Sequence, residues 1–143
     1  MCGNSSLRMI RSTLPHPGLT ALDLGRCRLG DDGARVVAGV VADITSLEEL
    51  DLGLNDLGSE GAAAVAKALE ANQSVRELDL SYNGIVPEGA AAVAKALASN
   101  ESMRNLDLSY NFIGPAEGAA AVANALASSE SVIELNLAYN RIG

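Results

Sequence analysis

Apolar residues follow two alternating patterns along the chain. In blocks such as Leu47-Glu-Glu-Leu50-Asp-Leu52, apolar and polar residues alternate with a period of two, which is typical of a short β-strand with one buried face. Between the blocks the period is helical, and Val65, Ala68 and Leu69 stand at i, i+3 and i+4. The pattern therefore predicts strands that alternate with helices, an α/β fold. Equivalent helix faces recur at Val37/Val40/Val41, Val93/Ala96/Leu97 and Val122/Ala125/Leu126.

Four residues indicate where helices begin and end. Pro87 and Pro115 suit the first turn of a helix, where the backbone N–H has no intrahelical partner. Asn72 and Asn100 each follow a helical segment, and asparagine tolerates the left-handed conformation that commonly closes a helix. We therefore expect both asparagines to end helices in that conformation.

The strand blocks return at a fixed spacing, which is the mark of a repeat protein. They begin at Leu19, Leu47, Val75, Met103 and Val132, so the spacings are 28, 28, 28 and 29 residues. Each block is followed by Asn or Cys and then by Leu or Ile, and the unit reads L-x-x-L-x-L-x-x-N/C-x-L. The one extra residue falls in Ile113–Gly118, the expected turn into a helix, where an insertion leaves the array in phase.

This unit resembles the leucine-rich repeat, in the long class found in ribonuclease inhibitor, nucleotide-binding immune receptors and Ran GTPase-activating protein. The resemblance covers 19–143 as four complete repeats plus a partial fifth. It implies a right-handed solenoid, a segment of a horseshoe, with a concave parallel sheet and helices on the convex side. Such a solenoid usually binds another protein on its concave face and is not an enzyme.

Both ends depart from a capped array. Apolar residues within 1–18 suggest the degraded helix of an earlier unit, so we interpret this segment as a partial helical cap. At the other end the last strand has no helix after it, and Leu135, Leu137 and Ile142 are expected to be partly uncovered. The segment is therefore expected to belong to a longer array or to pack end to end against a neighbour.

Charge and composition exclude several classes of function. The net charge is −8, so binding to nucleic acid through phosphate contacts is not expected. No apolar run approaches the roughly 20 residues that span a bilayer, so we expect no membrane segment. Two cysteines are too few for a disulfide framework or a zinc site, which favours a cytoplasmic protein without metal or cofactor. His16 lies in no recognisable catalytic triad, and no catalytic residue is assigned.

Because repeats stack in register, equivalent residues are expected to form columns about 4.8 Å apart across the sheet. One column contains Asp51, Asp79 and Asp107, and the adjacent one contains Glu49 and Glu77. Two interpretations stay open: a habit of this repeat, or a binding surface for a basic partner. Arg76 and Arg104 are expected to lie close enough to offset part of the charge.

A second set of positions carries every tyrosine of the chain: Tyr82, Tyr110 and Tyr139 each precede the Asn of a repeat, and Phe112 lies beside them. Tyrosine is favoured in binding surfaces because it offers a large area at a small entropic cost. Adjacent rings also pack on one another without any partner. The sequence leaves both interpretations open.

The Asn of each repeat is expected to be structural, since its amide both donates to and accepts from buried turn backbone. Cys27 takes the same place in the first repeat. The leading hypothesis is a non-catalytic module that binds a protein through its acidic and tyrosine-lined concave face. The alternatives are an architectural subunit that packs through its open end and a regulator of a small GTPase, the latter implied only by the resemblance.

Overall fold

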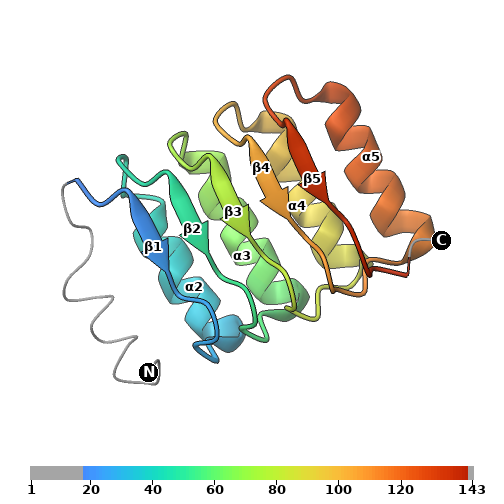
Figure 1. Ribbon diagram of the computed structural model, residues 1–143, viewed down its shortest axis with the longest axis horizontal. Coiled ribbons are helices and arrows are strands. Elements are labelled where there is room, and N and C mark those ends of the chain that lie inside the picture. Colours follow the sequence, from blue (N-terminus) through green and yellow to red (C-terminus); the bar gives the residue numbers. More distant parts are fainter. Residues whose placement is uncertain (1–17, 142–143) are drawn as a thin grey trace.

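The computed structural model describes residues 18–141, and these form one row of strands backed by one row of helices (Figure 1). The five strands are parallel and follow the chain in the order β1-β2-β3-β4-β5. The predicted α/β solenoid is therefore confirmed. In chain order the elements are β1 (Ala21–Asp23), α2 (Gly30–Val41), β2 (Glu49–Asp51), α3 (Gly58–Ala71), β3 (Glu77–Asp79), α4 (Pro87–Ser99), β4 (Asn105–Asp107), the π-helical turn η1 (Gly114–Gly118), α5 (Ala119–Ser128) and β5 (Glu134–Asn136).

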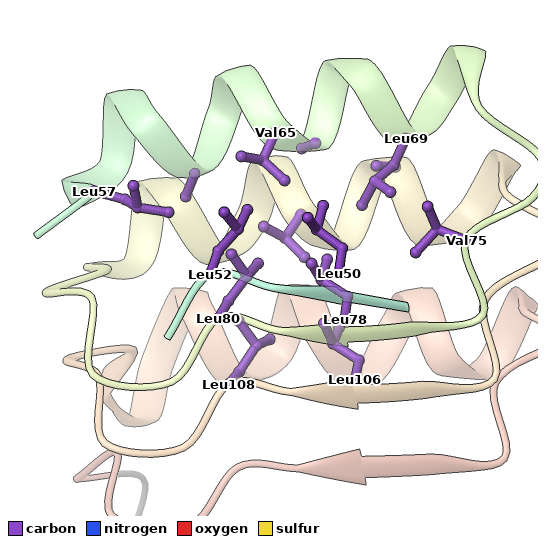
Figure 2. Packing of buried hydrophobic residues seen from close by; sticks show 14 of the residues in the cluster. Leu50, Leu52, Leu57, Val65, Leu69, Val75, Leu78, Leu80, Leu106 and Leu108 are labelled. Atoms are coloured by element: carbon purple, nitrogen blue, oxygen red, sulfur yellow. The ribbon is translucent and has the colours of Figure 1, made fainter. Parts of the chain in front are cut away.

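The core lies between the sheet and the helices. In β2 the side chain of Glu49 is exposed, that of Leu50 is 2% exposed, and that of Asp51 is half-buried, as a strand with one buried face requires. Leucines from successive repeats stack below one another and meet Val65 and Leu69 of α3 (Figure 2). Every repeat thus completes the core of its neighbours.

Glycine in the first turn of α3 and of α4 lets each of these helices approach the preceding one closely. A Cβ on Gly61 would lie 3.1 Å from the Cβ of Ala34 on α2, and a Cβ on Gly89 would lie 2.9 Å from the Cα of Ser59 on α3. These distances are shorter than ordinary carbon contacts. The small residues of the helices therefore set how tightly the outer layer stacks.

The predicted asparagine ladder is present behind the ends of the strands. The Oδ1 atom of Asn55 accepts from the N–H of Cys27 at 2.8 Å, and its Nδ2 donates to Leu24 O at 2.8 Å. The N–H of Asn55 in turn donates to Oδ1 of Asn83. The same links continue through Asn111 to Asn140, and all four amides are buried. The ladder satisfies turn backbone that no strand or helix would satisfy.

Asn72 and Asn100 do not close helices in the left-handed conformation, so that prediction was wrong. Their φ/ψ values are −94/121° and −90/129°, which is extended backbone. Each side chain reaches into the preceding repeat instead: Nδ2 of Asn100 donates to Leu69 O at 2.9 Å, and its Oδ1 accepts from the N–H of Met103 at 2.8 Å. A second ladder therefore joins the repeats at the other end of the helices.

The inserted residue of the last spacing is absorbed by η1. A π-helical turn accommodates one more residue than an α-helical turn, so α5 continues in phase. Gly118 is required there, because a Cβ at this position would lie 2.2 Å from the carbonyl oxygen of Ile113. The prediction that the insertion lies in the turn into a helix is confirmed.

The C-terminal end of the described array is less well covered than its middle. Within α5 only Val122 and Ala125 are buried, and Leu126, Leu135 and Leu137 are half-buried. The expected partial exposure of Leu135 and Leu137 is confirmed. Two predictions lie outside the described residues: the exposure of Ile142, and the cap predicted over 1–18, of which positions 1–17, with His16, are not described.

Candidate functional site

The strands align the predicted acidic residues in two columns on the face opposite the helices. Register pairs Glu49 with Glu77, and it pairs Asp51 with Asp79 and Asp79 with Asp107. These columns line a groove of about 900 Å³ that crosses all five strands. We call them the Glu column (Glu49, Glu77 and Glu134, with Ala21 and Asn105) and the Asp column (Asp23, Asp51, Asp79 and Asp107, with Asn136).

The Asp column also has a structural task, because each member ends its strand with the same turn. Oδ1 of Asp51 accepts from the N–H of Gly53 at 2.8 Å, and Oδ1 of Asp107 accepts from both the N–H and the hydroxyl of Ser109. Asn136 makes the equivalent bond to the N–H of Ala138 at 3.0 Å. A neutral amide therefore serves the turn as well, and the turn alone does not explain four negative charges.

Burial raises the pKa of Asp51, and the neighbouring carboxylates of Asp79, Asp23 and Asp107 raise it further. The hydrogen bond from the N–H of Gly53 acts in the opposite direction without cancelling the rise. Neighbouring strands are about 4.8 Å apart, so the carboxylates of the column carry like charges at short range. The groove therefore concentrates negative potential.

Within residues 18–141 no salt bridge joins an arginine to the acidic columns, and the partial compensation by Arg76 and Arg104 stays a prediction. In residues 18–141 the ion pairs all involve Arg35, which lies on α2 and contacts Asp31, Asp32 and Glu60. Nη1 of Arg104 donates instead to the carbonyl of Ser131. The acidic columns are thus left without a salt bridge from the described part of the chain.

The three tyrosines form one continuous stack, which we call the tyrosine ladder. The ring centroids of Tyr82 and Tyr110 are 4.1 Å apart with an interplanar angle of 10°, and those of Tyr110 and Tyr139 are 4.3 Å apart at 15°. The rings stay 44%, 39% and 71% exposed in chain order. A hydrogen bond with the Tyr82 hydroxyl raises the pKa of Tyr110, and one with Tyr139 acts in the opposite direction without cancelling the rise. The predicted mutual packing is therefore present, and a large aromatic edge remains open to solvent.

The ladder rests on an unusual backbone. Residues before the Asn or Cys of each repeat have positive φ, between 53° and 58°, a conformation that favours glycine or asparagine. Leu54 holds this position in the second repeat with φ 57°, and it is 41% exposed. The same turn thus directs one side chain per repeat outward, irrespective of its type.

Sequence reasoning missed Ile133, which is 76% exposed and lines the groove beside β5. The equivalent residues of the preceding repeats are Arg104, Arg76 and Glu48, so an isoleucine here breaks a polar column. That break was the available signal.

Phe112 is 50% exposed, and the guanidinium of Arg141 lies 5.2 Å from its ring centroid, which is a cation–π contact.

A family model described as "Leucine Rich repeat" matches this chain three times, over residues 17–38, 44–66 and 71–94. The chain is a leucine-rich repeat protein. Its assignment to the ribonuclease-inhibitor-like class stays a prediction. No curated protein matches the sequence of this leucine-rich repeat array.

Solved structures resemble the array in fold. One is titled "Leiomodin-1 Actin-Binding Site 2 (ABS2)", with a TM-score of 0.81, 18% identity, and coverage of 94% of this chain and 78% of that chain. Another is a tropomodulin C-terminal domain from Caenorhabditis elegans, with a TM-score of 0.79, 14% identity, and coverage of 94% and 81%.

Among the described residues of the repeat array, no helix is long and apolar enough to cross a membrane, and no cluster of three or more His, Cys, Asp or Glu side chains is arranged to hold a metal ion.

Proposed function

We propose that this leucine-rich repeat protein is a non-catalytic interaction module that binds another protein in the groove of its sheet. The observation that supports this is the combination of two acidic columns without salt bridges, which line one open groove, and a stacked, half-exposed tyrosine ladder, which follows the strands along the chain. Charged columns attract and orient a complementary partner, and exposed aromatic side chains provide the contact area. The proposed module covers 19–143, with 1–18 as a partial cap.

The proposed site consists of the residues predicted from the sequence. Asp51, Asp79 and Asp107 together with Glu49 and Glu77 provide the charge, and Tyr82, Tyr110 and Tyr139 provide the aromatic edge. A partner with a basic surface beside an apolar one fits this arrangement. Actin is the first candidate to assay, because the leiomodin-1 structure of similar fold is titled as an actin-binding site.

Affinity capture from a lysate, followed by mass spectrometry, tests the proposal. An Asp79→Asn/Asp107→Asn variant keeps the turn hydrogen bond, as Asn136 does, and a Glu70→Gln/Glu88→Gln variant removes the same charge from the helical side. A partner that is retained by wild type and by the helical-side variant, but lost with the column variant, supports the proposal. A partner retained equally by all three refutes binding through the groove.

A second candidate, an architectural subunit, is favoured by the half-buried Leu126, Leu135 and Leu137 at the C-terminal end of the described array. Association through that end would depend on concentration and would be abolished by Leu137→Glu. Sedimentation of wild type and of Leu137→Glu across a hundredfold range of concentration tests this candidate separately from binding in the groove, because Leu137 does not line the groove. Regulation of a GTPase rests on family resemblance alone and would appear as a change in GTP turnover.

A further inference from the structure

The groove has a regular period along the solenoid. The Glu column and the Asp column run across all five strands with one residue from each, and the tyrosine ladder takes one residue from each of the last three repeats. Neighbouring strands are about 4.8 Å apart. A ligand that lies along the columns therefore meets at least one carboxylate about every 4.8 Å, and a pair of them on β2 and on β3.

This period selects among the conformations of a peptide. An α-helix presents side chains on one face about every 5.4 Å, once a turn. An extended strand presents them about every 6.8 Å, and polyproline II about every 9.3 Å. Over the three strand spacings from β1 to β4, the side chains of a helix fall out of step with the columns by roughly 2 Å, which a flexible lysine side chain can bridge. Those of an extended strand fall out of step by about 6 Å, which is more than one strand spacing.

The chemistry differs between the groove and the turns beyond it. The Glu and Asp columns line the groove, and they have no salt bridge within residues 18–141. The tyrosine ladder follows the Asp column along the chain, three residues beyond the carboxyl ends of β3, β4 and β5, and Leu54 holds the equivalent exposed position in the second repeat. These side chains lie outside the lining of the groove. A ligand that contacts both the columns and the ladder carries cations on one stripe and apolar groups on the adjacent stripe.

We propose that the groove binds a basic amphipathic α-helix of a partner protein, which lies across the strands and parallel to the tyrosine ladder. The proposal rests on the proposed function and specifies its partner. Lysine or arginine at i, i+4, i+7 and i+11 faces the acidic columns, and leucine or another large apolar residue on the adjacent stripe packs on the tyrosines. About three turns, or roughly 11 residues, cover the acidic strands.

Three labelled peptides of equal charge test this inference by fluorescence anisotropy with the full chain. The first places lysines and leucines in the pattern above on an alanine background. The second has a central alanine replaced by proline, which breaks the helix and leaves the charge unchanged. The third has the composition of the first in scrambled order. Circular dichroism of the complex reports whether the peptide gains helix on binding.

Two variants of the protein assign the contact. Tyr110→Leu is a mild change, since Leu54 holds the equivalent position in the same backbone conformation. Asp79→Asn/Asp107→Asn follows the precedent of Asn136. We expect the patterned peptide to bind at least tenfold more tightly than the other two, the Asn variant to weaken it about tenfold at 0.05 M salt, and Tyr110→Leu to weaken it about threefold.

The outcomes separate this inference from the proposed function. If all three peptides bind equally and the column variants weaken each of them, the helix is refuted and a protein-binding groove remains. If the variants leave binding of the patterned peptide unchanged, the groove is not the contact and both proposals fail. If wild type does not bind the patterned peptide while its lysate partner is still lost with the column variant, the helix alone is refuted.

Discussion

The Asp column predicts a stabilising substitution at Asp51, one of its two members with a carboxylate neighbour on both sides. Asp51 has one carboxylate neighbour on each side, Asp23 and Asp79, and burial and these neighbours raise its pKa. Asp51→Asn removes the charge and keeps an oxygen that accepts from the N–H of Gly53. The equivalent Asn136 already makes this bond, so the turn should persist. We expect the variant to be more stable than wild type at pH 7.

The magnitude follows from the strand spacing. Two charges about 4.8 Å apart repel by about 0.9 kcal/mol in water, and screening at 0.15 M salt lowers this to about 0.5 kcal/mol. The two neighbours together contribute about 1 kcal/mol, and the weaker neutral hydrogen bond to Gly53 offsets about half of it. The net gain is therefore about 0.5 kcal/mol at 0.15 M salt and about 1 kcal/mol at 0.01 M salt.

The pH dependence has a definite sign. Below the ordinary value of 3.8 the carboxyl of Asp51 is neutral in the folded and unfolded states, so charge repulsion does not distinguish variant from wild type. Folding raises this pKa, so above pH 3.8 the folded state binds more protons than the unfolded state. Wild type therefore loses stability relative to the variant as the pH rises, until the carboxyl of the folded state has ionised. The stabilisation of Asp51→Asn is thus absent at pH 3 and complete at pH 7.

Urea unfolding followed by circular dichroism, at both salt concentrations and both pH values, measures the effect. Asn136→Asp is the reciprocal variant, and Asp107 is its one carboxylate neighbour in the Asp column. The same arithmetic predicts almost no change at 0.15 M salt and a loss of about 0.2 kcal/mol at 0.01 M salt. Glu70→Gln on α3 controls for net charge alone. A gain that is equal at 0.01 M and 0.15 M salt, or a loss of stability at low salt, would refute repulsion within the column.

Three further changes test the packing. Gly89→Ala should destabilise by about 1–3 kcal/mol in thermal unfolding, because its Cβ would lie 2.9 Å from Ser59 on the preceding helix, whereas Gly39→Ala in open space should stabilise by about 0.5–1 kcal/mol. Asn100→Ala should cost about 2–4 kcal/mol in urea unfolding, since it leaves buried groups of two repeats unpaired, and a cost under 0.5 kcal/mol would contradict the second ladder. Tyr110→Leu should lose two stacking contacts, about 1–2 kcal/mol, unless the ladder does not stack in solution.

The solenoid could be predicted from the sequence because every unit states the same pattern again. Five blocks of alternating residues and four helical faces agree on one register, so a weak signal in one repeat is corrected by the others. The first asparagine ladder was predictable for the same reason, since its position is occupied by Asn or Cys in all five repeats. Consistency across repeats replaced the long-range information that a single sequence normally lacks.

Asn72 and Asn100 show where this reasoning fails. Their sequence positions suggest a local task, the end of one helix, and the tendency of asparagine toward the left-handed conformation supports it. Their amides instead satisfy carbonyls of the preceding repeat, such as Leu69 O, and this contact exists only after stacking. Ser129 holds the equivalent position in the last repeat, where its hydroxyl accepts from the N–H groups of Ser131 and Val132. The spacing of 28 residues between the two asparagines indicated a contact between stacked repeats, although each asparagine alone suggested only the end of a helix.

The two interpretations that the sequence left open for the tyrosines are compatible: the stacking is observed, and binding on the stacked rings stays a proposal. A left-handed backbone at Tyr110 costs on the order of 1 kcal/mol, and two stacking contacts of about 0.5–1.5 kcal/mol each offset it. Stacking also fixes the rotamers of the rings while leaving Tyr139 71% exposed. A partner that docks on rings already held in place loses little further side-chain entropy. Mutual packing therefore does not compete with binding; it prepares the aromatic edge for it.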